Sequence, residues 1–451
     1  MQENKMGVMP VKKLIVNMSV PMMISMLVQA LYNVVDSVFV AMLSENALTA
    51  VTLAFPLQNL MIAVGAGTGV GVNAMLSRAL GEKKYERSDK AANTAILLAI
   101  MSTIVFLILG LTITKPFINT QTTDPEIRQL GYTYLGIVMT IGIGIFMQVT
   151  FERLLQSTGR TNLSMISQMT GAIFNIIFDP ILIFGLGPFP KMGVAGAAYA
   201  TVCGQCVAAC LGLYLNLRHN HELHFSLKKV LHPEAKIIGK IYAVGVPSIL
   251  MMAIGSVMTY CMNMILKAFS STAIAVFGAY FKLQSFFFMP VFGLNNGLIP
   301  VLAYNLGARK RSRIDEALKF ALELAVCIML CGTIVLEIFP TQLLSLFSPS
   351  KDMLRMGIPA LRTIAIHFPI AACGIIMSSI FQAFSRSIYS LFVSLGRQLV
   401  ILIPVAWLLA QTGNVNNVWW CYPIAEVVSF ILSLIFFKKV YREEVKTLDL
   451  H

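Results

Sequence analysis

The sequence predicts an all-α integral membrane protein with twelve transmembrane helices in two six-helix bundles related by a parallel internal repeat. Three observations support this fold class. Of the 451 residues, 57% are hydrophobic and only 12% are charged, whereas soluble domains are about 25% charged. Twelve apolar runs are each long enough to cross a bilayer. A fixed shift of 226 residues brings the second half of the chain into register with the first.

Each run of about 18–25 mostly apolar residues predicts one transmembrane span. In chain order they lie near residues 14–40, 47–74, 91–113, 130–156, 163–185, 193–217, 238–268, 272–300, 316–338, 355–384, 388–410 and 418–437. The first run is too long for the core of a cleavable signal peptide and follows a polar, Lys-bearing start. We therefore expect a multi-pass protein of the plasma (inner) membrane.

Basic residues explain the net charge of +13. They gather in alternate loops, for example at 83–90, 309–313 and 438–446, while the opposite set of loops carries few. By the positive-inside rule this places both termini in the cytoplasm. The same pattern argues against nucleic acid as a partner, because the charge follows the membrane topology.

The internal repeat runs through four loops in one register. Adding 226 takes Gly67 to Gly293, Gly71 to Gly297, Leu80-Gly81 to Leu306-Gly307, Arg87 to Arg313 and Arg160 to Arg386. Two halves in the same membrane orientation are typical of transporters. We expect an N-terminal bundle at 1–217, a cytoplasmic linker at 218–236 and a C-terminal bundle at 237–451.

The cysteine and histidine patterns favour structural roles. All eight cysteines lie in apolar runs, and Cys203-x-x-Cys206 has no second pair, so packing is favoured over a redox or zinc site. His219, His221 and His224 lie in the linker, where a solvated segment is favoured over a metal site. We expect no cofactor.

Two acids lie deep in the apolar runs of the first half. An aspartate at such depth costs roughly 2.5–3.5 kcal/mol, so Asp36 and Asp179 are functional candidates by default. Asn175 is four residues before Asp179 and shares its helix face. Pro180 follows directly and leaves one carbonyl a turn back without its amide partner, which favours a kink. Asp36 and Asp179 map under the repeat to a methionine and a valine, so packing common to both halves does not explain them.

The two acids are predicted to lie at similar depth. Asp36 is 23 residues past Lys13 and Asp179 is 19 past Arg160, or about 35 and 29 Å along helices with a rise of 1.5 Å per residue. They could share one cavity and bind a proton or a cation. The alternative is two separately satisfied polar residues.

The motif Asn175-x-x-x-Asp179-Pro180, the run Gly65 to Gly71, and the segments at 179–185 and 193–198 resemble the multidrug and toxic compound extrusion (MATE) family over essentially the whole chain. The resemblance implies two bundles around a central cavity, alternating access, and export of small cationic amphipathic compounds in exchange for H⁺ or Na⁺. A monomer in the lipid bilayer is expected.

The pattern is most similar to the DinF-like branch, whose coupling site lies in the N-terminal bundle. Carried over, the resemblance implies a cation or proton site, with Na⁺ possible at Asp36, Asn175 and Asp179 and no other metal. Its residues would be Tyr32, Asp36, Tyr134, Asn175, Asp179 and, as a looser match, Thr201. The seventh and tenth spans lack the acids expected in the NorM-like branch.

Further residues in the apolar runs, three polar ones and one methionine, are candidates for binding substrate. Lys282, Gln284, His367 and Met289 are candidates for a substrate cavity, with packing or snorkelling as the alternative. Glu152, beside Arg153, is predicted to form a surface pair. Glu426 is predicted to face water or a neighbouring helix.

Other functions are less well supported. A lipid-linked oligosaccharide flippase of the same superfamily is the alternative, but it would favour a cationic cavity, whereas the deep charges here are chiefly acidic. No HExxH or GxSxG motif indicates an enzyme, and no filter-like repeat indicates a channel.

Overall fold

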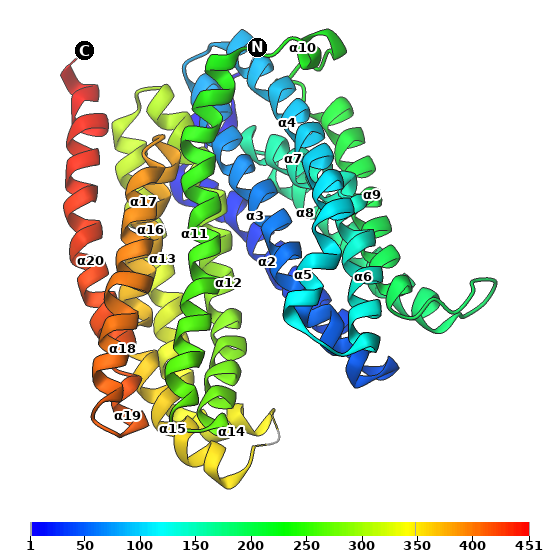
Figure 1. The fold of residues 1–451 in the computed structure, drawn as a ribbon. Helices are drawn as coiled ribbons and strands as arrows, with labels where there is room; N and C mark the ends of the chain where they lie inside the picture. Colours follow the sequence, from blue (N-terminus) through cyan, green and yellow to red (C-terminus); the bar gives the residue numbers. More distant parts are fainter. Residues whose placement is uncertain (1, 348, 451) are drawn as a thin grey trace. The chain divides into compact units, whose positions relative to one another are not determined.

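The computed structural model describes residues 2–347 and 349–450, and every regular element within them is a helix (Figure 1). Ten helices are long and apolar enough to cross a membrane alone, and two bent pairs bring the number to twelve. The predicted fold class is therefore confirmed.

The first half contains the helices α1 to α10. Their bounds are α1 Lys5–Val8, α2 Val11–Leu43, α3 Glu45–Gly81, α4 Tyr85–Thr112, α5 Thr114–Gln121, α6 Pro125–Thr140, α7 Ile143–Ser157, α8 Thr161–Phe184, α9 Val194–His219 and α10 Leu227–Leu231. The predicted fourth span is the pair α6 and α7, which bends by 45° at residues 141–142.

The second half repeats this order. It contains α11 Ala235–Lys267, α12 Ser271–Gly307, α13 Arg311–Ile338, α14 Pro340–Ser345, α15 Lys351–Ala365, α16 Phe368–Ala383, α17 Ser387–Leu395, a π-helical stretch η1 Gly396–Leu402, α18 Ile403–Ala410, α19 Val415–Val418, α20 Cys421–Val440, and the short turns η2 Tyr441–Val445 and η3 Lys446–Leu450. The tenth span is the pair α15 and α16, bent by 47°.

The helix bounds confirm the repeat. Adding 226 to the bounds of α3 and α4 gives those of α12 and α13, and adding it to α8 gives the start of α17 and the end of α18. Positive φ angles also recur at corresponding positions of the loops. Lys83 and Arg309 both have φ of 60°, and Gly159 at 90° corresponds to Ser385 at 62°. Such left-handed residues are uncommon outside glycine, so the two loops share one turn geometry.

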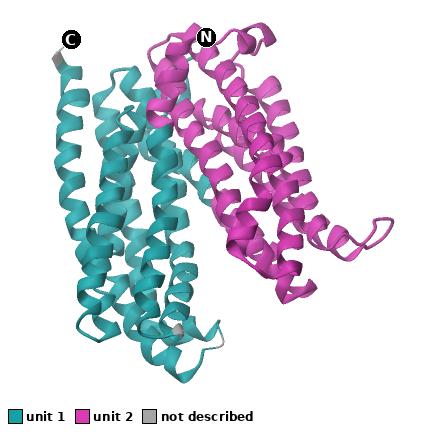
Figure 2. Ribbon diagram, in the orientation of Figure 1, with its two compact units in different colours: residues 1–23, 246–451 teal, residues 24–245 magenta. Residues whose placement is uncertain are grey.

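The chain forms two compact units, and their boundaries lie inside helices (Figure 2). Unit 1 contains Met1–Met23 and Val246–His451, and unit 2 contains Ile24–Gly245. The helix α2 therefore begins in unit 1 and ends in unit 2, whereas α11 begins in unit 2 and ends in unit 1. In each half, the first long helix therefore begins in one compact unit and ends in the unit that contains the rest of that half.

Glycines make these exchanged segments fit. In unit 2, a Cβ on Gly71 would lie 2.1 Å from the carbonyl oxygen of Ile241 on α11. In unit 1, a Cβ on Gly293 would lie 2.7 Å from the Cα of Met23, and one on Gly297 would lie 2.8 Å from Ser19 Oγ. The glycine-rich run seen in the sequence thus allows two helix backbones to approach closely, as small residues do in membrane bundles.

The substitution Gly71→Ala should destabilise the protein. The added methyl group would meet a backbone oxygen, and such overpacking costs about 1–3 kcal/mol, which outweighs the gain of about 1 kcal/mol in helix propensity. We expect a lower thermal unfolding temperature in detergent. The matched control is Gly136→Ala on α6, where a Cβ meets no atom within 4 Å. Equal unfolding temperatures for the two variants would contradict the close approach.

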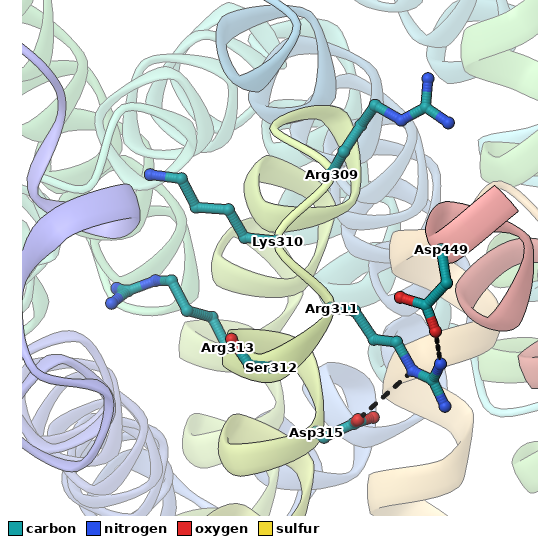
Figure 3. A pocket seen from close by; sticks show the side chains of 7 residues that line it. All are labelled: Arg309, Lys310, Arg311, Ser312, Arg313, Asp315 and Asp449. Atoms are coloured by element: carbon teal, nitrogen blue, oxygen red, sulfur yellow. Dashed lines mark ion pairs between the residues drawn. The ribbon is translucent and has the colours of Figure 1, made fainter. Parts of the chain in front are cut away.

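A basic segment, formed by the loop between α12 and α13 and the first turn of α13, holds both ends of the described chain within unit 1. Arg309, Lys310, Arg311, Ser312 and Arg313 line a pocket of about 500 Å³ together with two acids, Asp315 and Asp449 (Figure 3). The side chains diverge from the loop rather than converging on one point. This arrangement suits several separate contacts better than one anion site.

The contacts go to opposite ends of the sequence. Arg313 donates to the carbonyl oxygens of Met6 at 3.0 Å and Met9 at 2.7 Å, and Lys310 pairs with Glu3 at 2.7 Å. Arg311 pairs with Asp449 of η3 and, at 3.7 Å, with Asp315. The basic loop predicted by charge asymmetry therefore also anchors the terminal segments.

Arg313→Ala should release the N-terminal segment. Bonds donated by a charged group are worth about 1.5–3 kcal/mol each, so protection of the Met6–Met9 amides from hydrogen exchange should fall by at least about tenfold. Arg309→Ala is the matched control, since the Arg309 side chain forms no hydrogen bond or ion pair with the described residues and only its backbone N–H donates, to the Leu306 carbonyl. Unchanged protection in Arg313→Ala would show that packing alone holds the segment.

Candidate functional site

The residues predicted to form a coupling site all lie in unit 2, on four helices. Tyr32 and Asp36 are one turn apart on α2, Asn175 and Asp179 are one turn apart on α8, Tyr134 is on α6 and Thr201 is on α9. Asp179 is 0% exposed and Asp36 is 9% exposed. The i, i+4 spacing on α2 and α8 places each pair of side chains on one helix face.

Thr201 connects the two helices that carry the acids. Its Oγ1 accepts a hydrogen bond from Asn175 Nδ2 at 3.2 Å and lies 3.4 Å from the hydroxyl of Tyr32. The small residues of α9 permit this approach, since a Cβ on Gly204 would lie 2.9 Å from the carbonyl oxygen of Gly171 on α8. The close α8–α9 contact therefore brings Asn175 to Thr201.

Tyr134 is buried, and its hydrogen-bond partner is a residue that was not among the predicted site residues. Its hydroxyl donates to Gln58 Oε1 of α3 at 3.2 Å. Gln58 lies in the second predicted span, and a glutamine within an apolar run is the signal that could have drawn attention to it. Tyr134 also interacts electrostatically with Asp36, so it belongs to the surroundings of the acids.

The carboxyl groups of Asp36 and Asp179 lie close enough to interact electrostatically with each other. Both carboxyl oxygens of Asp179, Oδ1 of Asp36 and Oδ1 of Asn175 are buried without a hydrogen-bond donor among the described residues. A buried polar atom without a partner is costly. Two carboxylates and an amide oxygen would be satisfied by a proton between the acids or by a hard cation, which prefers oxygen ligands.

The chain around Asp179 adds a further acceptor. The helix α8 continues through Pro180 and ends at Gly185, whose φ of 72° provides a left-handed cap. Pro180 has no N–H, so the carbonyl of Ile176 loses its helical donor. Asn175 and Asp179 thus flank a stretch of loosened backbone.

The four residues predicted for a substrate cavity lie in unit 1. His367 is buried at the bend between α15 and α16, with Nδ1 2.5 Å from the Ile364 carbonyl oxygen. Lys282 is exposed and its amine lies 5.9 Å from the ring centroid of Phe347. Gln284 and Met289 are half-buried on α12. Their role in binding substrate remains a prediction.

Two predictions about acids can be compared with the structure, and one of them needs correction. The surface pair predicted for Glu152 and Arg153 is wrong, because both are buried, at 7% and 9% exposure. Of the two surroundings predicted for Glu426, water or a neighbouring helix, the structure shows the second: Glu426 on α20 is only 3% exposed and its carboxylate lies 3.7 Å from the Arg397 guanidinium of η1. A deep acid is therefore also present in the second half, where it has a basic partner. Hydropathy cannot show which face of a helix is turned inward.

Comparison with known proteins places this geometry in a family. The MatE family model matches residues 21–181 and 247–408. The multidrug export protein MepA of Staphylococcus haemolyticus is 26% identical over 423 residues, covering 94% of this chain and 92% of the relative. An FAD transporter of Shewanella oneidensis is 27% identical over 424 residues, covering 93% and 92%.

The fold of this chain also matches that of a solved transporter structure over nearly its full length. The outward-facing conformation of a multidrug resistance MATE family transporter of the MOP superfamily superposes with a TM-score of 0.92 at 26% identity, covering 100% of this chain and 99% of the other. The two matched segments of the family model correspond to the two halves of the repeat. The chain therefore belongs to the MatE family, whose members are membrane transporters and not enzymes.

Proposed function

We propose that the protein is a multidrug exporter that moves small cationic amphipathic compounds out of the cell in exchange for H⁺ or Na⁺. The observation that carries the proposal is the buried Asp36–Asp179 pair with its unpartnered oxygens. The names of the MepA relatives support the multidrug part. The proposed setting is a monomer in the plasma membrane with both termini in the cytoplasm.

In the proposed cycle, the coupling ion changes the charge of the acid pair. A proton or Na⁺ bound between Asp36 and Asp179 removes the repulsion of two buried negative charges. The ion and the substrate then favour different conformations, and this differential affinity couples their movements.

The connectivity of α2 suggests how the ion acts on the whole protein. Asp36 and Tyr32 are on the part of α2 that belongs to unit 2, whereas residues up to Met23 belong to unit 1. A change in the packing of α2 around Asp36 is therefore transmitted along a continuous helix into the other unit.

The test is transport of a fluorescent organic cation in proteoliposomes, with pH and Na⁺ gradients imposed separately. Transport under either gradient supports the proposal and identifies the ion. FAD, named for the Shewanella relative, serves as an anionic competitor that should not inhibit at concentrations where a second organic cation does. Transport under neither gradient, or inhibition by FAD alone, would refute the proposal.

A further inference from the structure

The faces of α2 and α8 that carry the acids stay polar well beyond the acids. Counting back from each aspartate, polar residues recur at spacings of three, four or seven, which keeps them on one helix face. On α2 they are Asp36, Tyr32, Gln29 and Ser25. On α8 they are Asp179, Asn175, Gln168 and Ser164.

Hydrogen bonds join the two faces at successive levels. Thr201 links Tyr32 to Asn175 beside the acids. Gln168 Nε2 donates to Gln29 Oε1 at 3.2 Å. Gln29 is seven residues before Asp36, which is about 10 Å along a helix. This second level lies towards the end of the bundle where Arg160 and the basic residues 83–90 are found.

The polar residues continue into α7 at that end. Ser164 Oγ accepts from Gln156 Nε2 at 2.9 Å, and Gln156 Oε1 accepts from Arg153 at 3.4 Å. Directly before Arg153 is Glu152, whose Oε1 accepts from Gln148 Nε2 at 3.0 Å. Glu152 is 7% exposed. A buried acid that follows directly on this chain of polar residues therefore lies at the basic end of the same unit, where Asp89, which pairs with His224 and Lys229, is also buried.

Helix packing alone does not account for this set. Polar side chains do hold membrane helices together, but both halves of the repeat share that need. Under the shift of 226, Gln29 maps to Gly255, Gln168 to Ser394 and Glu152 to Ser378. Gln156, in contrast, maps to Gln382. Gln29, Gln168 and Glu152 are thus found only in the half that contains Asp36 and Asp179, whereas Gln156 is common to both halves.

We propose that these residues form a polar track through unit 2 that carries protons between the acid pair and Glu152. One proton leaves the Asp36–Asp179 pair, is passed through hydroxyl groups and through water that the amide side chains hold by hydrogen bonds, and is bound by the Glu152 carboxylate. Glu152 then releases it to water at the basic end. The ionisable groups beside the track are Arg153 at Glu152 and Tyr32 and Tyr134 at the acid pair. The inference rests on the proposed exporter function and assigns H⁺ as the coupling ion.

The experiment separates proton release from substrate binding. Glu152→Gln and Gln168→Leu are measured in proteoliposomes in two modes: uptake of a fluorescent cation driven by a pH gradient, and exchange of labelled for unlabelled cation without a gradient. Exchange returns the transporter with substrate bound and needs no proton release. Ser378→Ala, at the repeat counterpart of Glu152, is the matched control.

We expect both variants to lose at least about tenfold in gradient-driven uptake, since positioned proton-transfer groups contribute this much or more, while exchange stays within about twofold of the unmodified protein. Ser378→Ala should change neither mode. Equal loss of both modes in folded protein would assign the residues to packing and overturn the track. Unchanged gradient-driven uptake in both variants would also contradict the track. Transport driven by Na⁺ alone would contradict the track but leave the exporter function intact.

Discussion

Asp179→Asn should abolish gradient-driven export while the protein still folds, and Asp36→Asn should do the same. An amide cannot take up the proton, and it offers a cation one neutral oxygen in place of a carboxylate. We expect export to fall by about a hundredfold, which corresponds to a loss of about 3 kcal/mol in the coupling between ion and substrate. The measurement is uptake into proteoliposomes under the gradient that drives the unmodified protein.

The stability of the same variants separates coupling from folding. Asp179 is fully buried and its oxygens have no donor among the described residues, so replacing a buried charge by a neutral group should leave the thermal unfolding temperature unchanged or raise it. Asp352→Asn, an exposed acid paired only with Arg355 in the described chain, is the control and should export normally. A folded Asp179→Asn protein that exports at the normal rate would refute the coupling role of the acid pair.

The sequence predicts the fold well because the bilayer restricts it. Each span must be about 20 apolar residues long, and the 226-residue repeat has to preserve helix lengths. The bounds of α3 and α12 match under this shift. The exchange of helix segments at Met23 and Gly245 could not be predicted, since α2 and α11 are continuous apolar helices on both sides of the boundary.

The candidate site is predictable to a similar extent. The spacing of Asn175 and Asp179 predicts that they share one face of a helix. Their position in an apolar run predicts that burying the carboxylates costs free energy, which singles out the acids as functional candidates. The contact of Thr201 with Tyr32 depends on how closely α9 approaches α2 and α8, which helix spacing does not encode. The surface position predicted for Glu152 is wrong for a related reason. Near the end of a span, hydropathy does not show whether a helix face contacts lipid, water or protein.

Glu426 and Arg397 illustrate the same limit, since they come from different helices and neither has a polar counterpart at the same position of the first half. Arg397 lies in the π-helical stretch η1, at the position where the repeat has Gly171 in a regular α-helix. Single π turns within helices are rare and often mark functional positions. A close glycine contact in the first half is thus replaced by an ion pair in the second.

Arg397→Leu should therefore be strongly destabilising. Removing one member of a buried ion pair leaves an uncompensated charge and costs about 3–5 kcal/mol. The Arg397 side chain is 27% exposed and the contact is 3.7 Å long, so we expect about 2–3 kcal/mol after allowing for screening. Thermal unfolding in detergent measures the loss. Arg442→Leu, which removes an exposed arginine whose side chain has no hydrogen bond or ion pair among the described residues, should have little effect.

The double substitution Arg397→Leu with Glu426→Gln distinguishes charge from packing. If the uncompensated carboxylate causes the loss, neutralising Glu426 should recover most of it, because an amide in that position carries no charge to be buried. If the arginine acts through its apolar stem against α20, the double variant should be no more stable than Arg397→Leu alone. Recovery would mean that the second half tolerates its deep acid only because Arg397 neutralises it. Asp36 and Asp179 have no such basic partner in the part of the chain that the structure describes, so they remain available for an ion.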